Sequence, residues 1–322
     1  MLKLRVFLPL LLSLLLVSPA PAQQKGLPET RNAALRYWLA FADMQDPPQD
    51  KNLLIGYVAS GDKPWDEAQL GAVLDQNESA ILRMQRATKL PECDWGLDYT
   101  EGPTGSIANA VKGRALGRLN TLYGVRQEVR GDEVGAVASW LAGIRFSQDV
   151  AKGGPLVAAL IANAGLLADL RAITRAAEAG KLSATQRHQV EATIRALPES
   201  PIDWGAALLI DQNSTEIGLQ SVMTSPDPAN AYEMLLGGAA PKGFTVPSAA
   251  EQEAHRKFNA ANVAAMRLPP EQTAERLASL QSTLKTLNPL FQETTPSLKR
   301  VNNARLEFVK ARQQLLQTLA TK

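Results

Sequence analysis

The residues best suited to chemistry lie in one short segment, Cys93 to Pro103. It holds three carboxylates and two aromatic rings: Asp94, Trp95, Asp98, Tyr99 and Glu101. Carboxylates can bind a cation, and aromatic rings can stack on a sugar. Because the alternating ligand spacing of a calcium loop is missing, we favour a structural role, in which Trp95 and Leu97 pack the loop onto the protein and the carboxylates accept backbone N–H groups. The five residues are therefore candidates for a ligand-binding or structural loop.

Other catalytic and metal-binding patterns are missing from the sequence. The only two histidines are His188 and His255, and Cys93 is the only cysteine. We expect both histidines at the surface, because their neighbours are polar. The sequence contains no His-Glu-x-x-His, Cys-x-x-Cys, Gly-x-Ser-x-Gly or phosphate-loop pattern. The sequence therefore predicts no metal site, no cofactor and no catalytic residue.

The start of the chain has the pattern of a secretory signal peptide. Lys3 and Arg5 precede an apolar run from Val6 to Val17, and Ala20-Pro21-Ala22 provides a small-residue cleavage site. The run is shorter than the roughly 20 residues that a membrane-spanning helix needs. We therefore expect residues 1–22 to be removed and the protein to be exported, to the periplasm or the exterior, with no integral membrane span after cleavage.

Composition and charge limit the kinds of partner. The chain has 34 basic and 32 acidic side chains, and removal of Lys3 and Arg5 leaves 32 of each. A neutral chain without a basic stripe does not attract nucleic acid, so we expect no nucleic-acid partner. Hydrophobic residues make up 45% of the 322 residues, which indicates a globular protein. A single cysteine excludes an intramolecular disulfide, so packing must supply the stability.

The elements that must position the loop are helices. Apolar residues recur at helical spacing from residue 28 onward, and no stretch alternates as a strand would. The clearest helices follow one another between residues 104 and 197, with breaks at 130–132, 153–155 and 180–182. Short connections of this kind join antiparallel neighbours. The sequence therefore predicts an all-α fold of antiparallel helical hairpins, as a tetratricopeptide-like or irregular solenoid or a bundle.

Two features predict how these helices pack. The helix from 156 to 179 is apolar almost all round in its first half, which is typical of a central buried helix. Gly117, Gly124 and Gly131 recur every seven residues, and Gly135 and Gly143 follow. Glycine inside a helix costs about 1 kcal/mol relative to alanine, so we expect these glycines to permit close helix crossings.

A change of composition suggests the domain organisation. Residues 224–247 are rich in proline and glycine and predict a linker or long loop around one short helix near 229–236. We therefore expect a helical-hairpin domain at 23–223 and a C-terminal helical segment at 248–322. The latter ends in two apolar stripes, Leu277 to Leu287 and Val301 to Leu315, which we expect to pack together as an antiparallel hairpin. A homodimer through these stripes is the alternative.

Two motifs carry a family resemblance. The first is Asn32-Ala33-Ala34-Leu35-Arg36-Tyr37, and the second is the Cys-x-Trp-x-Leu-Asp-Tyr-x-x-Gly-Pro loop that begins at Cys93. With these motifs, about the first half of the mature chain resembles a group of uncharacterised secreted or envelope-associated bacterial helical proteins. The resemblance implies a tetratricopeptide-like helical fold, although the characteristic 34-residue repeat cannot be laid over the chain. It implies no activity and no site residues.

These observations favour binding over catalysis. The leading hypothesis is an exported, non-enzymatic helical scaffold that holds a protein or peptide partner in a groove between hairpins. One alternative is a binder of a sugar or lipid, with the loop around Trp95 at the mouth of the pocket. Another is an enzyme of the helical-toroid glycosidase kind, because two carboxylates suffice for glycoside hydrolysis. The aromatic content of only 5% argues against that enzyme.

The signal peptide can be tested directly. When the full gene is expressed in a bacterial host, we expect the exported fraction to begin at Gln23, measured by N-terminal sequencing and intact mass. Replacing Ala20 and Ala22 with bulky residues should leave the precursor uncut, because the peptidase accepts small side chains there. A cytoplasmic product that retains Met1 would contradict the prediction.

Overall fold

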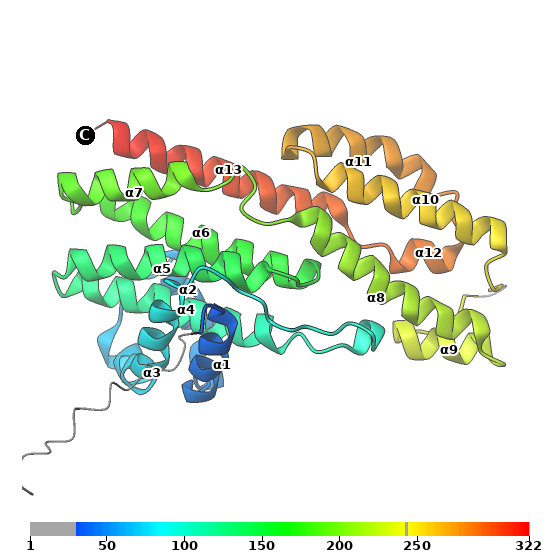
Figure 1. The fold of residues 1–322 in the computed structure, drawn as a ribbon, viewed down its shortest axis with the longest axis horizontal. Helices are drawn as coiled ribbons and strands as arrows, with labels where there is room; N and C mark the ends of the chain where they lie inside the picture. Colours follow the sequence, from blue (N-terminus) through cyan, green and yellow to red (C-terminus); the bar gives the residue numbers. More distant parts are fainter. Residues whose placement is uncertain (1–29, 242–243, 322) are drawn as a thin grey trace, which may run out of the picture. The chain divides into compact units, whose positions relative to one another are not determined.

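The structure is a computed structural model that describes residues 30–241 and 244–321, and a compact unit begins at Arg31. The predicted signal peptide lies outside the described residues. Within them the protein is all-helical without a sheet, and an isolated bridge between Asn32 and Glu92 is the one β feature. The predicted all-α class of antiparallel helical hairpins is confirmed (Figure 1).

The elements follow in chain order. They are α1 (Ala33–Asp43), η1 (Gln49–Lys51), α2 (Asn52–Ser60), α3 (Glu67–Ala87), η2 (Gly102–Thr104), α4 (Ala108–Val129), α5 (Glu133–Ala151), α6 (Leu156–Glu178), α7 (Ala184–Ala196), α8 (Trp204–Thr224), α9 (Pro228–Leu236), α10 (Ala249–Met266), α11 (Pro270–Leu284), α12 (Pro289–Thr294) and α13 (Leu298–Ala320).

The helices from α4 to α7 begin and end close to the predicted breaks. Gly131 has a φ of 78°, which lets the chain turn after α4, and the Asp132 carboxylate accepts the Gly135 N–H at 2.9 Å to cap α5. Ser183 and Gln186 form a reciprocal capping box at the start of α7. Local sequence therefore determines these boundaries.

Close approach explains some of the predicted glycines, but not all. A Cβ at Gly124 of α4 would collide with the Trp140 indole of α5, and one at Gly143 of α5 would collide with Asp169 of α6. A Cβ at Gly117 would meet only the Phe146 ring, at an ordinary 3.8 Å. Gly131 belongs to a turn instead of a crossing. The interpretation as close crossings is thus confirmed at Gly124 and Gly143 and wrong at Gly117 and Gly131.

Helix α6 occupies the centre of the larger hydrophobic cluster, in contact with α4, α5, α8 and α13. Among the described residues, it is the helix long and apolar enough to cross a membrane by length and composition, and 61% of its apolar window is buried inside the protein. Buried leucines, alanines and one isoleucine fill its contacts with the neighbours. The expectation of a central buried helix is confirmed.

Helix α13 returns along α6 and also contacts α7 and α11 (Figure 1). Its apolar stripe is buried at Val301, Phe308 and Leu315. The stripe was predicted to pack on the leucines of α11, but more of it lies against α6, because α13 is long enough to extend well past α11. The leucine stripe of α11 is therefore covered only in part, with Leu277, Leu280 and Leu284 half-buried.

Arginines tie α13 to the ends of other helices. Arg305 donates to the Leu268 carbonyl, just after α10, at 2.6 Å, and Arg312 donates to the Leu197 carbonyl, just after α7, at 2.9 Å. Helix C-termini present unpaired carbonyls and the negative end of the dipole, so cations are favourable there. Burial lowers the pKa of Arg305 to about 10. These bonds fix the position of α13 along its own axis.

A second, smaller hydrophobic cluster joins α8 and α9 with α10 to α12. Its centre includes Tyr232, Phe258, Leu290 and Phe291. The short helix predicted near 229–236 is confirmed as α9. The proposed division of the chain at 224–247 stays a prediction.

The contrast between two glycines on α4 gives a stability test. We expect Gly117→Ala to stabilise the protein by about 1 kcal/mol, because the methyl group fits and alanine favours a helix. Gly124→Ala should destabilise it by about 1 to 3 kcal/mol, because the gain in propensity is outweighed by overlap with the buried Trp140 ring.

The measurement is the free energy of unfolding from urea titration of both variants and the parent. Each variant serves as the other's control, since both make the same substitution in the same helix. Equal effects at the two positions would contradict the packing argument.

Candidate functional site

The predicted loop is anchored to the helices by Trp95. This side chain is only 6% exposed and stacks on Tyr37 and Phe41 of α1, with ring centroids 5.5 and 5.9 Å apart. Trp38 meets it edge to face at 5.6 Å. Its ring is therefore part of the aromatic core rather than an exposed stacking platform.

The indole of Trp95 leads to a buried polar centre around Asp149 of α5. Trp95 Nε1 donates to the Asp149 carbonyl at 2.6 Å, and the Tyr37 hydroxyl donates to the Asp149 carboxylate at 2.9 Å. Arg145 and Lys152 form ion pairs with the same carboxylate at 3.1 and 2.9 Å. Asp149 is fully buried, so these partners compensate the cost of removing its charge from water. The centre joins α1, the loop and α5.

Two groups beside this centre are held protonated. Burial, followed by the nearby Asp149 carboxylate, raises the pKa of the Cys93 thiol to about 12. The same two causes raise the pKa of the Tyr37 phenol. Because the thiolate is the nucleophile, this shift disfavours reaction of Cys93 at neutral pH.

The other predicted residues make local contacts. Asp94 and Asp98 each accept the N–H two residues ahead, at 3.0 and 2.9 Å, and the bond from Thr100 lowers the pKa of Asp98. The Tyr99 hydroxyl donates to the Gly153 carbonyl at 3.0 Å, and burial raises the pKa of Tyr99 to about 12. Glu101 is exposed. The loop thus brings Trp95 and Tyr99 against the end of α5 and keeps its carboxylates at the surface, and ligand binding by the loop stays a prediction.

The far end of the loop packs on α8. A Cβ at Gly218 of α8 would lie 3.0 Å from the Pro103 ring, and one at Gly102 would lie 2.9 Å from Ile217. Gly102 also has a φ of 66°. The loop therefore extends from the aromatic core around α1 to α8 and connects these two parts of the fold (Figure 1).

The two histidines occupy different environments. His188 is exposed on α7, as predicted. The prediction for His255 is wrong, because its ring is only 4% exposed and stacks on Phe291 of α12 at 4.0 Å. Burial lowers the pKa of His255. Its polar sequence neighbours lie on the outer face of α10, whereas the ring points into the smaller cluster.

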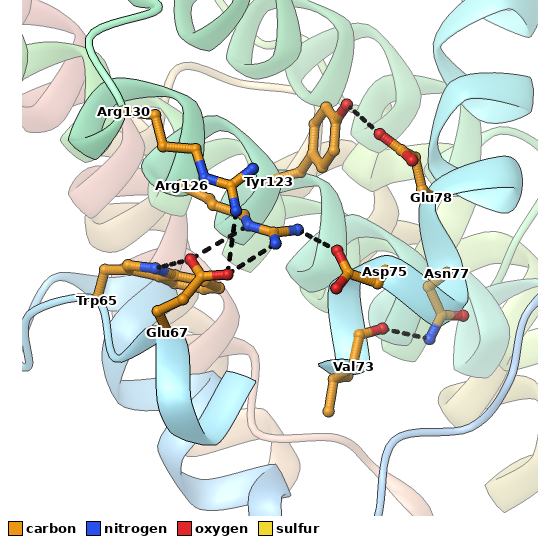
Figure 2. Close-up of polar contacts among 9 residues, drawn as sticks. All are labelled: Trp65, Glu67, Val73, Asp75, Asn77, Glu78, Tyr123, Arg126 and Arg130. Atoms are coloured by element: carbon orange, nitrogen blue, oxygen red, sulfur yellow. Dashed lines mark hydrogen bonds and ion pairs between the residues drawn. The ribbon is translucent and has the colours of Figure 1, made fainter. Parts of the chain in front are cut away.

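A cluster of charges between α3 and α4 is internally neutralised. Figure 2 shows Arg126 of α4 between Glu67 and Asp75 of α3, at 2.7 and 2.6 Å, with Arg130 also on Glu67 at 3.1 Å. Trp65 donates to the second oxygen of Glu67 at 2.9 Å. Because each arginine has a carboxylate partner, the cluster joins two helices and leaves no charge for a ligand.

A cleft that suits a ligand lies between α10, α11 and the start of α13. Its volume is about 730 Å³, within the range of about 300 to 1,000 Å³ typical of ligand sites. One wall is the half-buried leucine stripe of α11, with Leu277, Leu280 and Leu284, and Phe258 and Leu298 extend the apolar lining. The cleft runs from Ala274 to Leu284, which corresponds to roughly 15 Å along the helix.

A few polar groups accompany this apolar lining. Asn262 of α10 lines the cleft, is 3% exposed, and has an amide nitrogen without a hydrogen-bond partner among the described residues. Gln281, Asn303 and Lys299 lie at exposed positions of the lining. A buried amide donor without a partner costs free energy, and a ligand carbonyl could satisfy it.

Sequence reasoning missed the cleft because the apolar stripe on α11 predicted full packing against another helix, which leaves no cleft. The position of the cleft depends on where two hydrophobic clusters meet. Leu277 and Leu298 belong to the larger cluster, and Phe258, Leu280 and Leu284 belong to the smaller one. The sequence signal that was present is the pair Ala274 and Ala278, whose small side chains lie beside the leucine stripe.

Comparisons with known proteins add no relative. No family model matches the chain, and no curated protein or solved structure gives a significant match. The chain is thus described as an all-helical protein, and its resemblance to a bacterial envelope family stays a prediction.

A second buried carboxylate has a very different environment from Asp149. Asp169 of α6 is 1% exposed, and the Thr121 hydroxyl donates to it at 2.7 Å. No cation forms an ion pair with it among the described residues. Burial raises the pKa of Asp169 well above its usual range, and the Thr121 bond lowers it only in part.

The sign of the pH effect follows from this shift. Between the ordinary aspartate pKa of about 3.9 and the raised folded value, the folded state binds more protons, so stability falls as pH rises. We expect Asp169→Asn to become progressively more stable than the parent from pH 5 to pH 8, by at most about 1.4 kcal/mol per pH unit. Urea titrations at several pH values give this difference.

Asp98→Asn is the control, because its stability relative to the parent should change with pH in the opposite direction. Because the Thr100 bond lowers the pKa of Asp98, the parent should gain stability over this variant as pH rises through the acidic range. A pH-independent difference between Asp169→Asn and the parent would show that Asp169 is ionised in the folded protein.

Proposed function

We propose that this protein is an exported, non-enzymatic helical scaffold that binds an apolar segment of a partner polypeptide in the cleft between α10, α11 and α13. The half-covered leucine stripe of α11 carries the proposal, because it presents apolar surface along a helix inside a defined cleft. Apolar surface of this kind is favourable to cover. The proposal includes a tetratricopeptide-like relationship to secreted or envelope-associated bacterial proteins.

The dimensions of the cleft favour a peptide over a compact ligand. A length of roughly 15 Å corresponds to about three helical turns or to four or five extended residues. Aliphatic side chains of the partner would fill the lining, as in other helix-in-groove and extended-peptide complexes. The Asn262 amide would donate to a partner carbonyl, which gives the complex a polar anchor.

A variant at the edge of the cleft tests the proposal. Ala278 is exposed and lines the cleft, so Ala278→Glu places a charge against the partner's apolar side chains without disturbing the core. Short random peptides selected on the intact chain should be rich in apolar residues, and their affinity, measured by fluorescence anisotropy, should fall at least about tenfold in this variant.

Ala192→Glu is the matched control, because Ala192 is an exposed alanine on α7 outside this cleft. Its affinity for the same peptides should equal that of the parent. Equal loss in both variants, or failure to select any peptide, would refute the proposal. Analytical ultracentrifugation of the free chain tests the other possible occupant of the cleft, a second copy of the same chain. Self-association of the parent that is abolished by Ala278→Glu would identify this second copy as the partner.

A further inference from the structure

A second cavity, of about 310 Å³, lies between α4 and α6. Helix α5 packs against both and contributes Phe146, Ser147 and Val150 to the lining, while α2 and α13 contribute residues at its margins. The cavity shares no lining residue with the apolar cleft. The two sites can therefore be tested independently.

Small residues make this cavity. Gly113 and Gly117 line it from α4, and Gly165 and Ala168 line it from α6. Gly113 allows α4 to approach Val150, where a Cβ would lie only 2.8 Å away. Gly117 instead faces space, because its Cβ would meet only the Phe146 ring, at 3.8 Å. Close packing of α4 against α5 therefore requires glycine at position 113, whereas glycine at position 117 keeps the cavity open.

Three arginines line the same cavity. Arg114 and Arg118 stand one turn apart on α4, and Arg171 lies on α6. Within the described part of the chain, no hydrogen bond or ion pair engages any of these guanidinium groups, in contrast to Arg126 on the same helix α4. The lining contains one carboxylate, Glu307 of α13, so the site has a net positive charge.

The charge extends beyond this cavity. Arg171 and Glu307 also line an adjoining cavity of about 290 Å³, where Arg175, Lys310 and a second carboxylate, Glu178, complete the charged lining, so its positive excess is small. Arg114 and Arg118, four residues apart on α4, are close enough to repel each other, and burial together with the neighbouring Arg114 lowers the pKa of Arg118. An anion between them would remove this repulsion.

We propose that the cavity between α4 and α6 binds a phosphoryl group, held by Arg114, Arg118 and Arg171. Guanidinium groups match the oxygens of a phosphate in paired hydrogen bonds, and cations from two facing helices can surround its charge. The hydroxyl of Ser147, without a hydrogen-bond partner among the described residues, adds a neutral donor. Phe146, Val150 and Ile161 lie beside the cations, which suits a phosphate ester of a small organic molecule.

Isothermal titration calorimetry of the intact chain with inorganic phosphate and with phenyl phosphate tests the site. We expect saturable binding that weakens about tenfold in Arg118→Ala and in Arg171→Ala, because each removes a charge-assisted contact. Arg118→Lys should recover part of the loss, because it keeps the charge but not the paired geometry. Tighter binding of phenyl phosphate identifies an ester, and equal binding identifies the free ion.

Two controls separate a built site from diffuse charge. Arg86→Ala removes an exposed arginine of α3 outside the cavity and should leave the affinity unchanged. Gly117→Leu fills the cavity while all three arginines remain, and it should abolish binding. Circular dichroism and the melting temperature confirm that each variant folds.

The proposal is overturned by any of three results. The first is the absence of saturable binding of both probes by the parent. The second is an equal loss in Arg86→Ala and Arg118→Ala, which would indicate general attraction of anions to the surface. The third is full binding by Gly117→Leu, which would place the anion outside the cavity.

Discussion

The buried carboxylate of Asp149 is the interaction on which the N-terminal half of the described structure depends. A fully buried charge is stable only when paired, so Arg145 and Lys152 must lie beside it and Tyr37 must donate to it. The carbonyl of the same residue receives the Trp95 indole. One residue near the end of α5 therefore positions α1 and the base of the loop, and the loop in turn reaches α8.

Close packing around α5 is the second constraint. Gly124 lets α4 approach the Trp140 ring of α5, and Gly143 lets α5 approach the Asp169 side chain of α6, with no room for a methyl group at either position. Helices held this closely cannot adjust to fill every space, because protein interiors are rigidly packed. Where small residues continue past the contact, as at Gly117 and Ala168, a cavity remains. Small residues at some positions thus bring the helices together, and small residues at others leave space between them.

The charged residues of the chain serve two purposes. Arg126, Arg305 and Arg312 have carboxylate or carbonyl partners and hold helices together. Arg114, Arg118 and Arg171 lack such partners among the described residues and gather around a cavity. A net charge near zero conceals this difference, because composition counts charges without recording which are neutralised. The proposed peptide cleft and phosphoryl site accordingly differ in chemistry, one apolar and the other cationic.

The sequence by itself determined the helical class, most boundaries between residues 104 and 197, and the capping of α5, α7 and α10, because these depend on residues a few positions apart. It also pointed to the anchoring of the loop through Trp95. It misplaced His255 and could not locate either cavity. Only the tertiary structure decided that α13 packs mainly on α6 and that Arg171 and Arg118 line one cavity, because such neighbours are brought together by the packing of whole helices, which no local spacing encodes.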